Sequence, residues 1–212
     1  NASVSSSSGR TIPVIDPSDG QPFDEIQRGT ASDIDQAVRA ARQCYDMVWG
    51  KVSAADRGRL LMRLSQKVAE HADELAAIEQ RDCGKPTKQA RADAAALARY
   101  FEFYAGACDK FHGETIPYQD GYSVFTWREP HGVTGHVIPW NYPMQIFGRS
   151  VGGALAAGNV CVVKPSEDAC LSLLRVAQLA AEVGFPAGAL NIVTGYGHEV
   201  GDALARHPGI DH

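Results

Sequence analysis

The sequence has few cysteines and no paired cysteine motif. Five cysteines occur among 212 residues, and none of them lies in a C-x-x-C pair. A disulfide framework or a structural zinc site needs a different pattern, so we expect reduced, mostly buried thiols in a cytoplasmic protein. The H-E-x-x-H pattern is also missing. We therefore expect no metal site, and we expect the seven histidines to lie on the surface or in loops.

Other absences exclude further classes of protein. The net charge is -5 and no basic cluster is present, which argues against a nucleic acid or an anionic membrane as a partner. No apolar run approaches the roughly 20 residues of a membrane-spanning helix. Residues 1–10 are rich in serine and lack the apolar segment of a secretory signal, so we predict a flexible tail there.

Residues 11–118 have the composition of a helical region. Alanine, leucine, glutamine and charged residues recur there at helical spacing. Ser32 and Ser53 are each followed three residues later by an aspartate, which predicts two helix N-caps. Gly84 is expected to end a helix, and apolar residues between 87 and 111 form one stripe of the next helix. We predict a mostly helical amino-terminal part without catalytic residues.

The pattern changes after residue 118. Within residues 119–132, the aromatic and β-branched run Tyr122–Trp127 predicts a strand. From residue 133 to 212, apolar strands alternate with amphipathic helices, which predicts parallel βαβ units in a Rossmann-like α/β fold. A further strand is expected near His212, so this part is expected to be truncated. The predicted strands are 133–138, 160–163 and 190–193, and the predicted helices are 143–157, 169–183 and 198–206.

Three loops follow these strands and are expected to share one edge of the sheet, where open α/β sheets bind ligands. In the first loop, Pro139 and Pro143 fix the backbone around Asn141. A rigidly held side-chain amide of this kind can stabilise an oxyanion. The alternative is that Asn141 caps the helix that follows. The residues alone leave both interpretations open.

The second and third loops have features of nucleotide binding. Glu167 follows the second strand, where an acidic residue accepts hydrogen bonds from an adenosine ribose, and Lys164 adds a donor. Residues 166–168 are also typical of an ordinary helix start, and both interpretations can hold together. Gly197 and Gly201 end a G-x-G-x-x-x-G pattern that is one residue longer than the usual dinucleotide fingerprint. As a phosphate-binding signal this pattern is weak.

One further pattern indicates a different chemistry. Residues 148–152 match the G-x-S-x-G nucleophile elbow of serine hydrolases, with Asp168 and His198 following in the required order. That elbow needs a strand directly before its serine, whereas Ser150 falls inside a predicted helix. A serine hydrolase that uses Ser150 therefore stays a disfavoured alternative.

Several segments, taken in order, resemble the aldehyde dehydrogenase superfamily. No single motif is very specific, but the ordered set is, and it covers most of the chain after the serine-rich tail. The segments are Glu129–Val133, Ile138–Pro143, Ala154–Asn159, Val163–Glu167, Pro186–Val193 and Gly195–Gly197.

The resemblance implies roles for residues at the sheet edge. Asn141 is similar to the family's oxyanion-hole donor, and Lys164 and Glu167 are similar to its adenosine-ribose ligands. A carboxylate that faces the ribose repels a 2′-phosphate, which favours NAD over NADP. The other cofactor contacts that the resemblance implies are Ile138, Pro139, Trp140, Pro165, Ser166, Gly197 and Gly201.

The resemblance also implies a reaction. A cysteine thiolate attacks an aldehyde, a hydride passes to NAD, and a glutamate activates the water that releases a carboxylic acid. In the family this cysteine and glutamate lie beyond the position of His212, so the present stretch lacks the catalytic domain and is expected to be inactive alone. The run Tyr122–Trp127 resembles the family's strand that joins subunits into homodimers or homotetramers. A nucleotide-binding module without catalysis is the alternative.

Two positions depart from the family's usual pattern. Ser150 stands where many members have a lysine. Arg149 stands where an aromatic wall of the substrate tunnel is common, and it is similar to the arginine of succinate-semialdehyde dehydrogenases. With Tyr142 and Ile146 lining the same tunnel, Arg149 is expected to bind the distal carboxylate of a semialdehyde acid. A solvated arginine on the helix surface is the equally favoured alternative.

Overall fold

Three parallel strands form the sheet around which the chain is organised. The computed structural model describes residues 5–212, in which β5 (Val133–Ile138), β6 (Val160–Pro165) and β7 (Leu190–Ile192) pair in that order. Both pairings are parallel, and every residue of β6 is buried. Burial on both faces is the usual state of a central strand between layers of helices. The predicted α/β fold and its three strands are confirmed.

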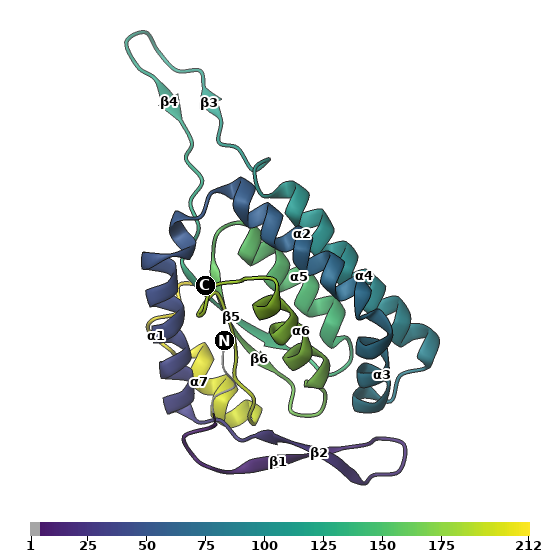
Figure 1. The fold of residues 1–212 in the computed structure, drawn as a ribbon. Coiled ribbons are helices and arrows are strands. Elements are labelled where there is room, and N and C mark those ends of the chain that lie inside the picture. Colours follow the sequence, from purple (N-terminus) through teal and green to yellow (C-terminus); the bar gives the residue numbers. More distant parts are fainter. Residues whose placement is uncertain (1–4) are drawn as a thin grey trace.

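Helices cover both faces of this sheet (Figure 1). The connecting helices α5 and α6 lie on one face, with α2, α3 and α4 packed outside them, while α1 and α7 lie on the other face. None of the helices within residues 5–212 has both the length and the apolarity to cross a membrane. The bounds are α1 (Ala31–Met47), α2 (Ala54–Glu70), α3 (Ala72–Cys83), α4 (Thr87–Ala107), α5 (Pro143–Ala156), α6 (Leu171–Glu182) and α7 (Asp202–Ala205), with a 3₁₀ turn, η1 (Trp49–Lys51).

The side chains of β5 show which helices lie on which face. His136 is hydrogen-bonded to Ser150 of α5, so this residue faces the connecting helices. A Cβ atom placed on the preceding Gly135 would lie 3.5 Å from Leu204 of α7, on the opposite face. Successive residues of a strand point to opposite faces, and the two helical layers are therefore separated by the sheet.

A β-hairpin precedes the helices, and the sequence prediction missed it. β1 (Thr11–Ile15) and β2 (Pro22–Gln27) pair antiparallel within the region 11–118 that was expected to be helical. Alternate residues of β1 are buried, and they pack with Cys170 in a small core of their own. The period-two alternation in Thr11–Ile15 was the available signal, but the run is only five residues long.

The helix ends confirm some of the predicted caps and correct others. Ser53 caps α2, because its hydroxyl accepts a hydrogen bond from the backbone N–H of Asp56 at 3.1 Å. Gly84 ends α3 in the left-handed conformation, with φ of 69°. The predicted cap at Ser32 is wrong: α1 begins after Thr30, which forms a capping box with Asp33. The helix thus begins earlier than predicted, and the carboxylate of Asp33 accepts from the N–H of Thr30 at 2.8 Å.

The predicted flexible tail of residues 1–10 needs a correction where the structure describes it. Ser6 donates a hydrogen bond to the carbonyl of Arg28 at 2.7 Å, and the backbone N–H of Ser7 donates to Asp33 at 2.9 Å. These bonds attach the serines to the end of β2 and the start of α1. Residues 1–4 lie outside the described residues, and for them the tail stays a prediction.

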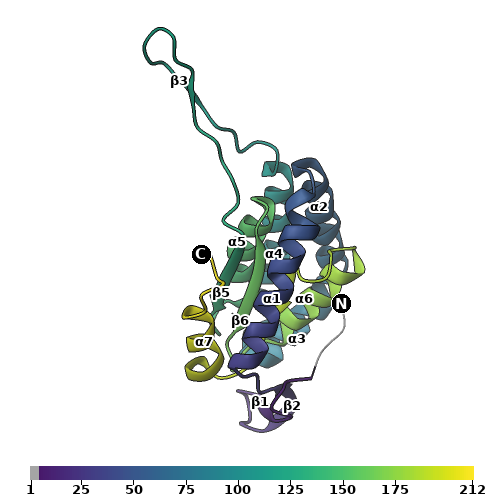
Figure 2. The ribbon, with the colours of Figure 1, turned by 90° about the vertical axis from the view of Figure 1, so that its left-hand side faces the viewer.

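A two-stranded arm projects from the body between α4 and β5 (Figure 2). β3 (Thr115–Ile116) and β4 (Val124–Phe125) pair antiparallel, so the strand predicted over Tyr122–Trp127 is shorter than expected. Next to this pair, on the side of the body, the N–H of Thr126 donates to the carbonyl of Glu114 at 2.8 Å. The arm exposes a set of large apolar side chains, namely Ile116, Tyr118, Tyr122, Phe125 and Trp127.

Candidate cofactor-binding site

The loops after the three strands meet at one edge of the sheet. Ile138 at the end of β5 lies opposite Pro165 at the end of β6, and the N–H of Ser166 donates to the carbonyl of Ile138 at 2.8 Å. One residue from each loop, namely Trp140, Glu167 and Tyr196, lines a single cavity of about 450 Å³. The predicted convergence of the loops is therefore what the structure shows.

The first loop presents Asn141 to solvent. The helix α5 begins at Pro143, and its N-cap position is Tyr142, where no side chain accepts a capping hydrogen bond. The alternative in which Asn141 caps the helix is therefore wrong. Asn141 is exposed, and within residues 5–212 its side chain makes no hydrogen bond. Both amide donors are free to bind a ligand.

The second loop holds a buried ion pair. The ammonium of Lys164 is almost fully buried and lies 2.5 Å from the carboxylate of Glu167, whose other oxygen accepts from the N–H of Gly197 at 3.2 Å. Partial burial raises the pKa of Glu167, but the hydrogen bonds from Lys164 and from backbone N–H groups outweigh burial and hold this pKa below its ordinary value. The helix α6 begins only at Leu171, so Glu167 is no part of an ordinary helix start.

The third loop contains a short π-helix, η2 (Gly197–Gly201), followed directly by α7. A Cβ atom on Gly197 or on Gly201 would meet nothing within 4 Å, so both glycines border open space. Gly195 has another role, because a Cβ there would lie 2.4 Å from Val200. Its φ of 149° also disfavours any side chain. Gly195 thus lets the loop pack closely against Val200, while Gly197 and Gly201 leave room for a ligand.

These groups fit the adenosine end of a dinucleotide. An ionised carboxylate accepts hydrogen bonds from ribose hydroxyls, and a buried ammonium beside it can donate one. Because its pKa is lowered, Glu167 carries its charge at neutral pH and can accept such hydrogen bonds. The uncovered backbone at Gly197 permits the close approach of a flat ring. The donor set and the open surface therefore suit this ligand.

The three residues predicted to contact substrate lie on the first turns of α5. Tyr142 is the N-cap residue, Ile146 is half-buried against the core, and Arg149 is exposed. Arg149 forms no ion pair with any residue that the structure describes. An exposed guanidinium without a carboxylate partner is available to a substrate anion, and it is equally compatible with simple solvation.

Ser150 and His136 form a hydrogen-bonded pair between α5 and β5. The hydroxyl of Thr134 donates to the carbonyl of Val160 at 3.0 Å, and it lies 2.9 Å from Nε2 of His136. Because the hydroxyl proton of Thr134 is used in the bond to Val160, Nε2 of His136 must be the donor to Thr134 and carries the imidazole proton. Nδ1 then accepts a hydrogen bond from the hydroxyl of Ser150 at 2.5 Å. His136 is mostly buried in a strand, so the expectation of surface or loop histidines is wrong for this residue.

The G-x-S-x-G pattern has a packing role. Ser150 lies within α5, not on a strand-to-helix turn, and its partner is His136 instead of His198. A Cβ atom on Gly148 would lie 2.9 Å from Leu97, and one on Gly152 would lie 2.9 Å from Tyr104, both in α4. The two glycines therefore let α4 and α5 approach closely. The hydrolase alternative lacks the turn that it requires.

The cysteines of the chain are poor nucleophiles. Four of the five are buried, and burial raises the pKa of Cys161 to about 12. The pKa of Cys83 is also raised to about 12, first by burial and then by nearby carboxylates. A thiol with such a pKa carries almost no thiolate at neutral pH. The expected inert role of these thiols agrees with this chemistry.

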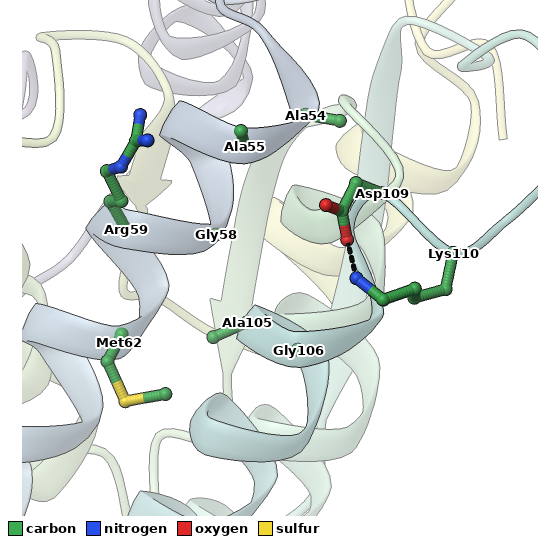
Figure 3. Close-up of a pocket in the computed structure, with 9 residues that line it drawn as sticks. All are labelled: Ala54, Ala55, Gly58, Arg59, Met62, Ala105, Gly106, Asp109 and Lys110. Atoms are coloured by element: carbon green, nitrogen blue, oxygen red, sulfur yellow. Dashed lines mark hydrogen bonds and ion pairs between the residues drawn. The ribbon is translucent and has the colours of Figure 1, made fainter.

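A second hollow lies away from the sheet edge. It has a volume of about 290 Å³ and lies between α2 and α4, where small residues leave space beside the exposed pair Asp109 and Lys110 (Figure 3). None of the residues predicted to bind cofactor or substrate lines it. The sheet edge therefore remains the candidate site.

Sequence reasoning missed a buried ionic cluster beneath the first loop. Glu79 and Asp93 are fully buried, and both bind the ammonium of Lys85. The available signal was that Glu79 and Asp93 occupy the inward stripe of their helices, three residues after the buried Ala76 and Ala90, respectively.

A parallel sheet whose loops converge at one edge is typical of the Rossmann-like, dinucleotide-binding class of protein. The sequence profile of the aldehyde dehydrogenase family matches residues 3–212, and the chain belongs to this family. It is 51% identical to a hydroxyisobutyraldehyde dehydrogenase of Mycolicibacterium austroafricanum and 44% identical to human retinal dehydrogenase 2. These matches cover 95% and 97% of the chain, but only 40% of each relative.

Solved structures of similar proteins have the same fold. A Burkholderia cenocepacia protein assigned to the aldehyde dehydrogenases superposes with a TM-score of 0.97 at 75% identity, covering 98% of this chain and 44% of the other. PnpE in complex with nicotinamide adenine dinucleotide superposes with a TM-score of 0.95 at 41% identity, covering 98% and 42%. The chain thus spans about two fifths of the length of the proteins that it matches.

The pair of His136 and Ser150 predicts a pH dependence of stability. Burial, followed by the nearby His212, lowers the pKa of His136 from 6.5 to about 4. Between these values the unfolded chain binds a proton that the folded chain does not. The contribution of neutral His136 to the free energy of unfolding is therefore fully present above pH 6.5. The free energy of unfolding falls by up to about 3 kcal/mol as the pH drops towards 4. Urea unfolding between pH 4.5 and 7.5 measures this loss.

The variant His136→Gln is the control for this prediction, because it keeps a hydrogen-bonding side chain but cannot titrate. We expect the pH dependence to flatten in this variant. A His136 imidazole resonance that titrates near pH 6.5 in the folded protein would contradict the burial on which the prediction rests.

Proposed function

We propose that this chain forms the cofactor-binding part of an NAD-dependent aldehyde dehydrogenase. The observation that supports this most strongly is the pairing of Ile138 with Pro165, which brings the loops of Asn141 and Glu167 to one edge of the sheet. A dinucleotide along that edge would contact Glu167 at its adenosine ribose and reach Asn141 at its reactive end. Membership of the family supports the same arrangement.

Each loop has its own task in this proposal. Lys164 and Glu167 hold the adenosine ribose, with Pro165 and Ser166 beside them. The backbone of residues 138–140 lies under the cofactor, and Gly197 and Gly201 leave space for the adenine. NAD is preferred to NADP because the ionised carboxylate of Glu167 repels a 2′-phosphate.

Asn141 has the catalytic task. Addition of a cysteine thiolate to the carbonyl carbon of an aldehyde places a negative charge on the carbonyl oxygen. The free amide of Asn141 donates a hydrogen bond to that oxygen and so lowers the energy of the transition state. Bound NAD supplies the acceptor for the hydride that leaves the same carbon, and hydrolysis of the thioester then releases the acid. The five thiols of this chain, with their raised pKa values, do not supply the nucleophile.

The substrate is proposed to be a small aldehyde that carries a distal carboxylate. Arg149 is exposed and unpaired within residues 5–212, and it lies on the same helix as Tyr142 and Ile146. A guanidinium binds a carboxylate through two parallel hydrogen bonds, which fixes the orientation of the substrate. The resulting preference is for a semialdehyde acid over a neutral aldehyde.

The arm is proposed to join subunits into a homodimer or homotetramer. The side chains of Phe125 and Trp127 are 64% and 76% exposed, respectively, on a two-stranded arm with free edges. Exposed strand edges with aromatic side chains favour pairing with another chain.

The cytoplasmic location of the protein stays a prediction.

Two substitutions test the cofactor and catalytic roles in the full-length protein. Asn141→Ala should lower kcat by about 10²- to 10³-fold because one oxyanion donor is lost. Glu167→Gln should instead leave kcat for NAD within a few-fold and reduce the preference for NAD over NADP by about tenfold, because the charge that repels the 2′-phosphate is removed. Initial-rate kinetics with both cofactors measures both effects. Unchanged kcat in Asn141→Ala would refute the proposed catalytic role.

Arg149→Ala tests the substrate class. We expect KM for succinic semialdehyde to rise at least about tenfold, because a bidentate charge-assisted contact is lost. KM for propanal, a neutral aldehyde of similar size, should change little. An equal rise for both substrates would show that Arg149 contributes to packing and not to recognition of the carboxylate.

Phe125→Glu tests the arm as an oligomer contact. A charge placed on the arm should shift the full-length protein towards smaller species in sedimentation velocity, because a carboxylate cannot be buried without a partner. Phe103→Glu is the matched control, since Phe103 is 59% exposed on α4, outside the arm. Equal sedimentation of the wild type and the arm variant would exclude the arm from the interface.

A further inference from the structure

A buried ionic cluster lies where α3 turns into α4. The ammonium of Lys85 lies 2.7 Å from Glu79 and 2.6 Å from Asp93, and both carboxylates are fully buried. Gln89 donates to Asp93 at 2.7 Å, and the hydroxyl of Ser172 donates to Glu79 at 2.8 Å. The two buried carboxylates are therefore satisfied by protein groups, while the side chain of Lys85 stays 11% exposed. Such a network is rigid, because moving any member leaves a buried charge without its partner.

The cluster and the residues next to it contact the first loop on both sides of Asn141. The ammonium of Lys85 lies 4.5 Å from the centre of the Tyr142 ring. The side-chain amide of Gln145, in the first turn of α5, donates to Asp93 at 2.6 Å. Before Asn141, the carbonyl of Trp140 accepts a hydrogen bond from the thiol of Cys83 at 3.4 Å.

Asn141 itself has no such contact. Its side chain is exposed, and within residues 5–212 nothing holds its amide. The position of that amide is therefore set by the backbone of residues 140–142. This backbone is fixed by the prolines at its ends and by the anchors on Trp140, Tyr142 and Gln145. Two of these three anchors, those on Tyr142 and Gln145, end on Lys85 or on its partner Asp93.

We propose that Lys85, held by Glu79 and Asp93, is a positioning residue that sets the location of the Asn141 amide. The inference rests on the proposed function, in which Asn141 binds the oxyanion. Lys85 does not touch substrate or cofactor. Its ammonium contacts the face of the Tyr142 ring, and it orients Asp93 so that this carboxylate can also bind Gln145. Displacement of a reacting group by about 1 Å costs up to about 10²-fold in rate, so such a support affects turnover directly.

A double-mutant cycle in the full-length protein tests this inference. The variants are Lys85→Gln, Asn141→Ala and the combination, assayed with NAD and propanal. We expect Lys85→Gln to lower kcat about tenfold or more and to change the Kd of NAD less than threefold, because Lys85 makes no contact with Lys164 or Glu167. In the Asn141→Ala background, Lys85→Gln should change kcat less than twofold, since the group that it positions is gone.

Two further variants separate positioning from stability. Gln145→Met keeps the ion pairs and removes only the link from Asp93 to α5, so it tests the inference even if Lys85→Gln does not fold. It should lower kcat by about threefold or more in the wild type and less than twofold in Asn141→Ala. Lys88→Gln is the control, because Lys88 is an exposed lysine in the first turn of α4. It should leave kcat unchanged.

The outcomes are distinguishable. If Gln145→Met and Lys85→Gln lower kcat by the same factor with and without Asn141, the cluster stabilises the fold only and the inference is overturned. If both variants leave kcat of the wild type unchanged, the inference is also overturned. If Asn141→Ala itself has no effect on kcat, the proposed function fails and the inference fails with it. Loss of both effects in the Asn141→Ala background supports the inference.

Discussion

The parallel pairing of β5 with β6 is the constraint on which the candidate site depends. Both strands end at the same level, with Ile138 opposite Pro165, so the chain leaves the sheet twice at one edge. A shift of one residue would turn the side chains of β6 to the opposite face. Because β6 is buried on both faces, such a shift would disrupt the packing on two sides at once. The register of the two loops is thus fixed by packing along the strands that carry them.

Buried lysines support the two loops that carry the proposed functional groups. Lys164 lies beneath the second loop and is neutralised by Glu167, and Lys85 lies beneath the first loop and is neutralised by two carboxylates. An ammonium that is removed from water binds its partners in a fixed geometry, since exchange with solvent would cost desolvation energy. The backbone of each loop can therefore remain exposed to a ligand while the ion pair next to it is shielded from water.

The parallel strands and the glycines of the third loop follow from local sequence. Strands 133–138, 160–165 and 190–192 are short apolar runs between helical segments, and that pattern defines a βαβ fold without further information. The short hairpin at Thr11–Ile15 and the buried cluster around Lys85 do not. The hairpin alternates over too few residues. In the cluster, Glu79 and Asp93 lie close to Lys85 in sequence, but Ser172 and Gln145, which bind the two carboxylates, come from the distant helices α6 and α5. Similarly, the partner of Ser150 could be recognised only once β5 and α5 were packed together.

The construction of the arm has a consequence for how sequences of this kind can vary. Its two legs are joined beside the β3–β4 pair by the bond between Thr126 and Glu114, and the residues beyond that bond extend away from the body. Insertions, deletions or exchanges past this rung should therefore leave the sheet, the helices and the three loops in place. The outer part of the arm is thus a modular appendage, which can be altered independently of the chemistry at the sheet edge.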